Sequence, residues 1–244
     1  MTLRIVVGAG GLVGTAIARH AANTDGDAVA VDLALATAPL SAEHLQLDAT
    51  SEDFAQWLAS AIADRSRVEL YYAAGQVAPL CRVTDTPPAA FEKAMHDLVV
   101  AYTVTSRFAE TTRQAGIAAS IVIIGSIGAH QAHRYMIGYD ASRAGLESVA
   151  RGLALEYGQH GVTTRVLAVG PIAESATTQA DGELLPALAR LVPTQRYAPI
   201  DQIAAAAIAY GGPAFDYANG HTLRLDGGLT IQLRPSDIER RPER

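Results

Sequence analysis

Seven short apolar segments alternate along this chain with longer helical patterns, and that alternation constrains the fold more than any other feature. The apolar segments are continuous rather than alternating in polarity, which is typical of parallel strands covered on both faces. They read LRIVVGA, AVAVD, HLQLD, VELYYAAG, SIVIIGS, TTRVLAVG and HTLRLDGG. The repeated succession of strand, helix and strand predicts βαβ units with right-handed crossovers, and therefore an α/β fold.

Helical patterns fill the spaces between these segments. We expect helices over residues 11–22, 53–64, 89–115, 139–160 and 199–212. No sequence repeat or interdomain linker is evident, so residues 1–244 are expected to form one domain. Residues 171–199 are predicted to form a partly helical substrate loop, or lid, over the carboxyl edge of the sheet. Residues 233–244 are expected to form a charged tail.

Composition excludes several classes of protein. Of the 244 residues 49% are hydrophobic, the net charge is −6 and no basic stripe occurs, so a filled core is expected and a nucleic-acid partner is not. The single cysteine, Cys81, excludes an internal disulfide and is either a reactive thiol or a packing residue. The first apolar segment begins at Leu3, which leaves no room for a signal peptide, and no stretch reaches the roughly 18 apolar residues of a membrane span. We therefore expect a cytoplasmic protein without a membrane partner.

A glycine-rich turn, VVGAGGLVG, follows the first predicted strand and opens the first predicted helix. Its spacing fits G-x-x-G-x-x-G, because position 13 is valine where G-x-G-x-x-G would need glycine. Glycines here let a pyrophosphate approach the N–H groups of the helix, whose dipole favours an anion. The alternative is an ordinary tight turn between strand and helix. The cofactor-binding residues expected in this turn are Gly8, Gly10, Gly11, Leu12, Val13 and Gly14.

An acidic residue at the end of the second predicted strand favours NAD over NADP. Asp32 ends the second strand, where a carboxylate accepts hydrogen bonds from ribose hydroxyls and repels a 2′-phosphate. No Arg or Lys stands beside the glycines or directly after Asp32. The alternative is a solvated aspartate at a strand end. Further cofactor contacts are expected from Asp48 and Ala49 after the third strand, and from Ala73, Ala74 and Gly75 after the fourth.

The stretch YDASR places Tyr139 and Arg143 four residues apart on one face of a predicted helix. A fixed cation beside a tyrosine stabilises the phenolate, which suits proton transfer to or from a carbonyl oxygen. The same helix carries apolar residues on more than one face, which favours packing against a second copy of the chain. These residues are Ala144, Leu146, Val149, Ala150, Leu153 and Ala154.

Taken together, these motifs resemble the short-chain dehydrogenase/reductase family nearly from end to end. The motifs are the glycine turn, Asp48, YYAAG, Ser126, YDASR, GPIAES and YANGHTLRLDGGLT, and Ser126 precedes Tyr139 at the family's usual separation. The resemblance implies a single-domain, Rossmann-like, doubly wound sheet of seven mainly parallel strands with helices on both faces. It also implies a nicotinamide cofactor, a homotetramer, catalysis by Ser126, Tyr139 and Arg143, and cofactor contacts from Pro171 and Ile172.

Several residues depart from the family pattern. Arg143 replaces the family's lysine, and Ala73 replaces an asparagine. The helix asparagine that holds a proton-relay water falls near Leu98 or Val99, neither of which forms side-chain hydrogen bonds. Arginine does not relay protons by titrating, because its guanidinium stays protonated.

Several residues near the expected cleft each have more than one candidate role. His130 and His133 are candidate proton shuttles or ordinary loop histidines, and no third ligand accompanies them, so no metal site is predicted. Glu174 is expected either to meet the substrate or to cap a helix. Arg134 and Tyr135 also border the cleft.

Three hypotheses follow from these residues. The first is an NAD(H)-dependent oxidoreductase that interconverts a secondary alcohol and a ketone on a small metabolite, with Tyr139 as acid or base. The second is a non-redox enzyme on the same scaffold, such as an epimerase, dehydratase or lyase. The third is a regulatory protein that binds a dinucleotide without turnover. Fold analogy alone does not separate the three.

Overall fold

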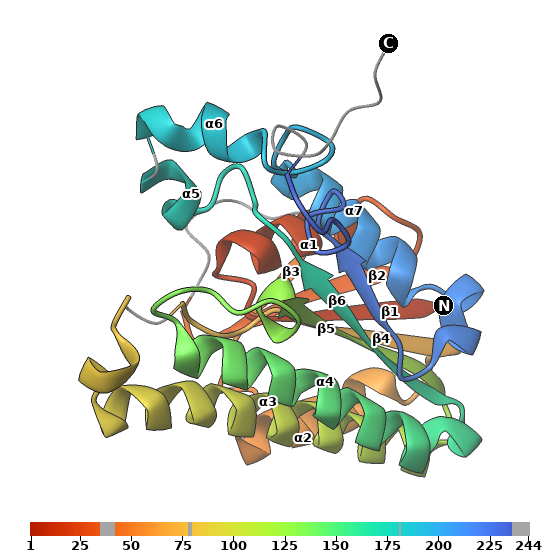
Figure 1. The fold of residues 1–244 in the computed structure, drawn as a ribbon. Helices are drawn as coiled ribbons and strands as arrows, with labels where there is room; N and C mark the ends of the chain where they lie inside the picture. The colour runs from red at the N-terminus through yellow and green to blue at the C-terminus, as the bar shows by residue number, and fades with distance from the viewer. Residues whose placement is uncertain (35–41, 78–79, 181, 236–244) are drawn as a thin grey trace.

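The computed structural model describes residues 1–34, 42–77, 80–180 and 182–235. Seven parallel strands form one sheet in the order β3-β2-β1-β4-β5-β6-β7 (Figure 1). All seven predicted strands are confirmed. They are β1 Thr2–Val7, β2 Asp27–Asp32, β3 Glu43–Gln46, β4 Arg67–Tyr72, β5 Ala118–Ser126, β6 Val162–Val169 and β7 Thr222–Leu225.

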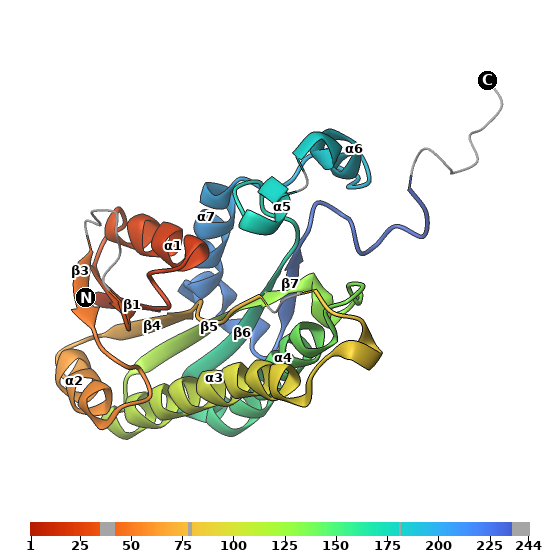
Figure 2. The same cartoon turned by 90° about the vertical axis from the view of Figure 1, so that its left-hand side faces the viewer.

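Helices cover both faces of the sheet, as Figure 2 shows from the side. Helices α1 (Leu12–Ala22) and α7 (Ile200–Gly211) pack on one face, and α2 (Glu52–Ile62), α3 (Pro88–Ala115) and α4 (Ile137–Tyr157) on the other. Successive residues of β1 point to opposite faces, so Ile5 belongs to the core under α2 to α4 and Val6 to the core under α1 and α7. This two-sided burial explains why the strands read as continuous apolar segments. The predicted fold class is therefore confirmed.

The strand order positions the candidate site. The chain runs outward from β1 through β2 to β3 and then crosses back to β4 on the other side of β1. In open α/β sheets, ligands bind beyond the carboxyl ends of the strands at such a reversal. The glycine turn follows β1, and the segment 73–77 follows β4, so both lie at this point.

Residues 171–199 form the predicted excursion at the carboxyl edge. Ile172 pairs with Ala198 in an isolated parallel bridge, which joins the two ends of the excursion. Between them lie α5 (Ala176–Ala180), the short 3-10 helix Gly182–Leu184 and α6 (Leu185–Ala189), seen at the upper left of Figure 1. The partly helical character is confirmed, whereas the function of this segment as a lid stays a prediction. Of the predicted tail 233–244, residues 236–244 lie outside the described residues.

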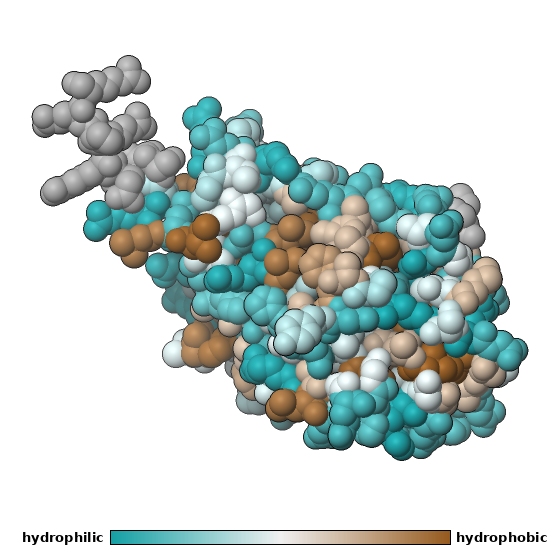
Figure 3. Space-filling model, turned by 90° about the vertical axis from the view of Figure 1, so that its right-hand side faces the viewer, coloured by the Kyte–Doolittle hydropathy of each residue, from teal (hydrophilic) through white to brown (hydrophobic). Residues whose placement is uncertain are grey.

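The surface carries scattered apolar side chains. On the face drawn in Figure 3 these form several separate groups between hydrophilic residues. Four of the six apolar residues expected to meet a second copy are buried within the subunit, namely Leu146, Ala150, Leu153 and Ala154. Helix α4 therefore offers a partner less free apolar surface than its sequence pattern predicts. In the described part of the chain, no helix has both the length and the hydropathy required to cross a bilayer.

Candidate active site

The glycine turn packs directly against the segment that follows β4. Gly8 has a φ of +85°, and a Cβ on it would lie 2.5 Å from the backbone nitrogen of Ala74. A Cβ on Gly14 would lie 2.0 Å from the carbonyl oxygen of Gly8. Any larger residue at either position would push the backbone apart, so the turn needs glycine for close packing. The fold therefore places the glycine turn beside Ala74, and both are expected cofactor contacts.

The N-terminus of α1 is open to a ligand. Gly10, Gly11 and Leu12 are exposed, and the N-cap residue Gly11 supplies no side chain to satisfy the first N–H groups of the helix. Such uncapped N–H groups, together with the helix dipole, bind phosphate groups. This end of the site therefore fits the pyrophosphate of a dinucleotide. Val13 is half-buried beside it.

Asp32 lies against the same turn. Its carboxylate accepts hydrogen bonds from the backbone N–H groups of Gly10, at 2.9 Å, and Ala34, at 3.1 Å. The acidic side chain thus marks one end of the glycine turn, at the position where the sequence predicts the adenosine ribose. That ribose contact stays a prediction.

Asp48 and Ala49 have evident structural functions. Asp48 Oδ1 accepts hydrogen bonds from the N–H and the hydroxyl of Thr50, at 2.8 and 2.7 Å, and so stabilises the turn before α2. Ala49 is 9% exposed and belongs to the core. Their predicted cofactor contacts are not needed to explain these positions.

Arg143 is buried between the segment after β4 and Tyr139. Its guanidinium carbon lies 4.7 Å from the centroid of the Tyr139 ring, and a Cβ on Gly75 would lie 2.7 Å from its Nη2. The residue is 7% exposed, yet its buried Nε has no hydrogen-bond partner among the described residues. Burial raises the pKa of the neighbouring Tyr72, and the charge of Arg143 works against that rise. Arg143 therefore holds a positive charge where the predicted cofactor and substrate would meet.

Ser126 joins the same cluster at the end of β5. It is 7% exposed, and its Oγ accepts a hydrogen bond of 3.1 Å from the N–H of Gly128. A Cβ on Gly128 would lie 2.2 Å from Oδ1 of Asp140 and 3.0 Å from the ring of His133. The His133 ring in turn packs edge-on against Tyr139, with 6.2 Å between ring centroids. The fold therefore brings Ser126, Tyr139 and Arg143 into one region.

Two acidic residues near the candidate site were not predicted from the sequence. Asp97 on α3 accepts a hydrogen bond of 3.0 Å from the N–H of Gln76, beside Gly75, and its charge contributes to the raised pKa of Tyr72. Leu98 packs against Gly145, and Val99 is 55% exposed. The polar side chain at this level of α3 is therefore that of Asp97, which directly precedes Leu98 and Val99. Asp140, inside the YDASR motif itself, is the second and pairs with His133.

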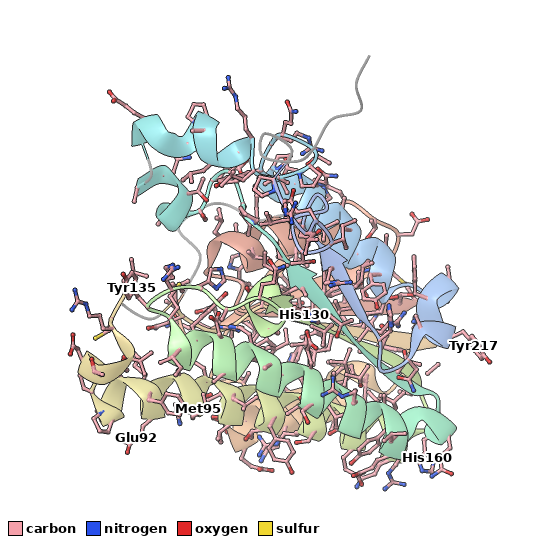
Figure 4. The ribbon with its side chains drawn as sticks, in the orientation of Figure 1. Glu92, Met95, His130, Tyr135, His160 and Tyr217 are labelled. Atoms are coloured by element: carbon pink, nitrogen blue, oxygen red, sulfur yellow. The ribbon has the colours of Figure 1, made fainter. Side chains whose placement is uncertain are left out.

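The remaining candidates have mainly structural contacts. Glu174 Oε2 accepts a hydrogen bond of 3.0 Å from the N–H of Ile200 and so caps α7. The Pro171 carbonyl accepts from Ala198 N at 3.1 Å, which helps to close the excursion. The Cys81 N–H donates to the carbonyl of Tyr135, and Figure 4 shows Tyr135 on the side of the molecule away from Tyr217. Within the described ranges, no group of three His, Cys, Asp or Glu side chains is arranged to hold a metal ion.

Comparisons with known proteins agree with this geometry. Residues 8–230 match a family model described as enoyl-(acyl carrier protein) reductase. A solved structure titled "short chain dehydrogenase/reductase family protein" superposes with a TM-score of 0.80 and 26% identity, over 95% of this chain and 98% of that chain. A structure titled as a putative 2-deoxy-d-gluconate 3-dehydrogenase from Agrobacterium tumefaciens with bound NADP has a TM-score of 0.81 over 95% and 97% of the two chains, at 23% identity.

Several curated relatives match over shorter stretches of this chain. The D-threitol dehydrogenase of Mycolicibacterium smegmatis is 38% identical over 116 residues, which are 46% of this chain and 44% of the relative. The matched stretches span about half the length of the curated relatives.

Proposed function

The chain belongs to the short-chain dehydrogenase/reductase family, and from that premise we propose that it is an NAD(H)-dependent oxidoreductase interconverting a secondary alcohol and a ketone on a small metabolite. One observation carries the proposal. A series of close approaches, linked by short stretches of backbone, leads from Asp32 at one end of the glycine turn to the candidate tyrosine. The series runs through Asp32, Gly10, Gly8, Ala74, Gly75, Arg143 and Tyr139.

The chain's own residues suit proton transfer at a substrate oxygen. When bound, the nicotinamide would supply hydride transfer at the adjoining carbon. The Tyr139 hydroxyl donates a proton to that oxygen in reduction and its phenolate accepts one in oxidation. The positive charge of Arg143, 4.7 Å from the ring, favours the phenolate. The Ser126 hydroxyl accepts from Gly128 and has no acceptor among the described residues, so its hydrogen can be donated to the substrate oxygen.

Arg143 would also hold the nicotinamide ribose. A buried guanidinium nitrogen without a partner is unfavourable in the free protein, and a ribose hydroxyl would satisfy it. Asp32 supports NAD over NADP, because a 2′-phosphate beside its carboxylate would meet an uncompensated negative charge.

The proposal is tested by following absorbance of the reduced nicotinamide while a panel of ketones and secondary alcohols is offered. Turnover with at least one member is expected for the wild type. Tyr139→Phe should abolish it and leave NAD binding, measured by calorimetry, nearly unchanged. Tight NAD binding without any redox change across the panel would favour the non-redox enzyme or the regulatory binding protein instead.

We further propose a cytoplasmic homo-oligomer, most simply a tetramer. Large apolar side chains remain exposed on two neighbouring helices, namely Leu155 on α4, which the sequence assigns to the interface, and Val99 and Tyr102 on α3. Light scattering at micromolar concentration tests this assignment, and a monomeric mass would exclude it.

A further inference from the structure

A histidine and a buried carboxylate form a hydrogen-bonded pair beside Tyr139. His133 Nδ1 lies 2.8 Å from Asp140 Oδ1, and the His133 backbone N–H donates to Asp140 Oδ2 at 2.7 Å. Because an ionised carboxylate only accepts hydrogen bonds, His133 Nδ1 carries the hydrogen and Nε2 is left with a lone pair. The two bonds fix both the ring orientation and the tautomer.

One member of the Asp140–His133 pair is buried and the other is exposed to solvent. The Asp140 side chain is 10% exposed and that of His133 41% exposed. The His133 ring packs edge-on against the Tyr139 ring. Nε2 has no hydrogen-bond partner among the described residues. A side chain so placed can receive a proton from water on one side and pass it toward Tyr139 on the other.

A second histidine in the same loop provides an internal contrast. His130 Nε2 lies 2.8 Å from Glu147 Oε1, seven residues after Asp140 on α4, although that oxygen lacks the geometry of a hydrogen bond. In the part of the chain that the structure describes, His130 makes no ring contact with Tyr139. Both histidines thus lie in the same loop and each faces a carboxylate on α4, but of the two only His133 contacts the candidate tyrosine.

We propose that His133, oriented by Asp140, exchanges protons between Tyr139 and solvent, an inference that rests on the proposed oxidoreductase function. In ketone reduction a bound nicotinamide would supply the hydride for the carbonyl carbon, and Tyr139 gives its proton to the oxygen. The imidazolium of His133 then returns a proton to the phenolate from Nε2, across one bridging water, and becomes neutral. Bulk water reprotonates Nε2, and in oxidation every proton moves in reverse.

This arrangement supplies a titrating group that Arg143 lacks, since a guanidinium does not release its proton at neutral pH. The ionisable groups around His133 come from three segments. On α4, Asp140 bonds His133 and Tyr139 packs against its ring, while Arg143 contacts Tyr139; Arg134 follows His133 in the loop, and Cys81 donates its N–H to the carbonyl of Tyr135. Asp140 bonds His133 and Arg143 stacks on Tyr139, and a proton that moves from an imidazolium to a phenolate leaves the net charge of the site unchanged.

The kinetic test compares His133→Gln with the matched variant His130→Gln, using NADH and a ketone found active in the panel. His133→Gln should lower kcat by about 100-fold, at the lower end of general acid–base effects, with a small change in KM. It should also remove the rise in kcat that accompanies titration of a histidine. His130→Gln should keep the rate and the pH profile of the wild type. Equal pH profiles in the two variants would overturn the proposal.

Asp140→Asn separates orientation from mere packing. The amide can still accept from the His133 backbone N–H but does not stabilise an imidazolium as a carboxylate does. A shift of the kcat–pH profile with unchanged thermal stability supports a positioning function. An unchanged profile contradicts it. In His133→Ala, free imidazole at millimolar concentration should restore part of the lost turnover, and a failure to do so also counts against the relay.

A measurement on the free protein keeps the inference separate from the proposed function. Tyr139 labelled with ¹³C at Cζ is followed by NMR across pH. A step in the Cζ shift should coincide with titration of a histidine, vanish in His133→Gln and persist in His130→Gln. If the wild type is inactive on every panel substrate but this step is seen, the proposed function fails while the coupling stands. If the wild type turns over a panel substrate but shows no such step, the proposed function stands and the coupling fails.

Discussion

Two arginines near the opposite ends of strand β4 differ in their hydrogen bonds, the part-buried Arg67 at the amino end and the buried Arg143 beyond the carboxyl end. At the amino end, Arg67 Nε lies 3.1 Å from Glu69, its terminal nitrogens each lie 2.9 Å from Asp216, and one of them also donates to the Gly211 carbonyl. Beyond the carboxyl end, Arg143 stacks on Tyr139 and has no ion pair or hydrogen bond among the described residues. One cation is satisfied by the fold and the other is not.

The difference separates structural charge from functional charge. Desolvating a cation is unfavourable unless partners compensate, so an unpaired buried arginine persists where function retains it. Around Arg67, Glu69 also accepts from Arg4 and from the hydroxyl of Tyr71. Arg165, fully buried nearby, is an intermediate case because it pairs with Asp216 through Nη2 alone. The charges at the amino end of the sheet are thus paired within the fold, and under the proposed function the unpaired charge at the carboxyl end binds a ligand.

Replacing Arg143, the unpaired cation, should reduce activity without reducing the stability of the fold. Arg143→Met is expected to reduce kcat/KM about 1,000-fold, roughly 4 kcal/mol, because it removes the charge that favours the phenolate. Its free energy of unfolding should stay within about 1 kcal/mol of wild type, since no partner is left unsatisfied. Steady-state kinetics and urea unfolding measure the two quantities. Arg143→Lys should retain part of the activity. A large loss of stability in Arg143→Met would contradict the proposed contrast between a structural role of Arg67 and a functional role of Arg143.

The matched change at the other end should have the reverse effect. Arg67→Met leaves Glu69 and Asp216 short of a cation and is expected to lower the free energy of unfolding by about 3 kcal/mol. Urea unfolding measures this loss. NAD affinity of the folded fraction should stay near that of wild type, because the residue lies at the amino end of β4, away from the glycine turn. Weakened NAD binding at full folding would contradict the division.

Asp32→Asn tests whether the Asp32 carboxylate, at the carboxyl end of the sheet, selects NAD over NADP. The amide still accepts from Gly10 but carries no charge to repel a 2′-phosphate. The ratio of NADP to NAD dissociation constants should fall about tenfold, equivalent to about 1.4 kcal/mol. Calorimetry with both cofactors measures this ratio. Tighter binding of NADP than NAD by the wild type would show that Asp32 does not select the cofactor.

Acid should lower the contribution of Asp216, at the amino end of the sheet, to the free energy of unfolding by a modest amount. Desolvation opposes ionisation of Asp216, but the hydrogen bonds and charge of Arg67, with those of Arg165, lower its pKa below the usual value. A lowered pKa stabilises the fold above the unfolded-state pKa, and this contribution is lost as pH falls through the folded-state value. Urea midpoints between pH 6 and about pH 3 should show a smaller decline in Asp216→Asn than in the wild type. Parallel declines would assign the acid sensitivity to other groups.

Local sequence pattern was sufficient for the strands, the main helices and the glycine turn. The central strands follow from continuous apolar segments, since a strand buried on both faces needs apolar residues at most positions, whereas the edge strands β3 and β7 are exposed or half-buried throughout and partly polar. Gly8 and Gly14 follow from backbone geometry that no other residue allows. These features depend on neighbours in the chain, and so they can be read from one sequence.

Tertiary structure alone decided how the site's charges are paired. No sequence pattern indicates that Asp140 holds His133, that Asp97 rather than Leu98 reaches the segment after β4, or that Glu174 caps α7. The same holds for Arg143, which was recognised as a cation near Tyr139 but not as a buried one without a partner. Such pairings depend on side-chain directions at the meeting of separate strands and helices, and a change of one rotamer redirects a charge by several ångströms while leaving the hydrophobic pattern unchanged.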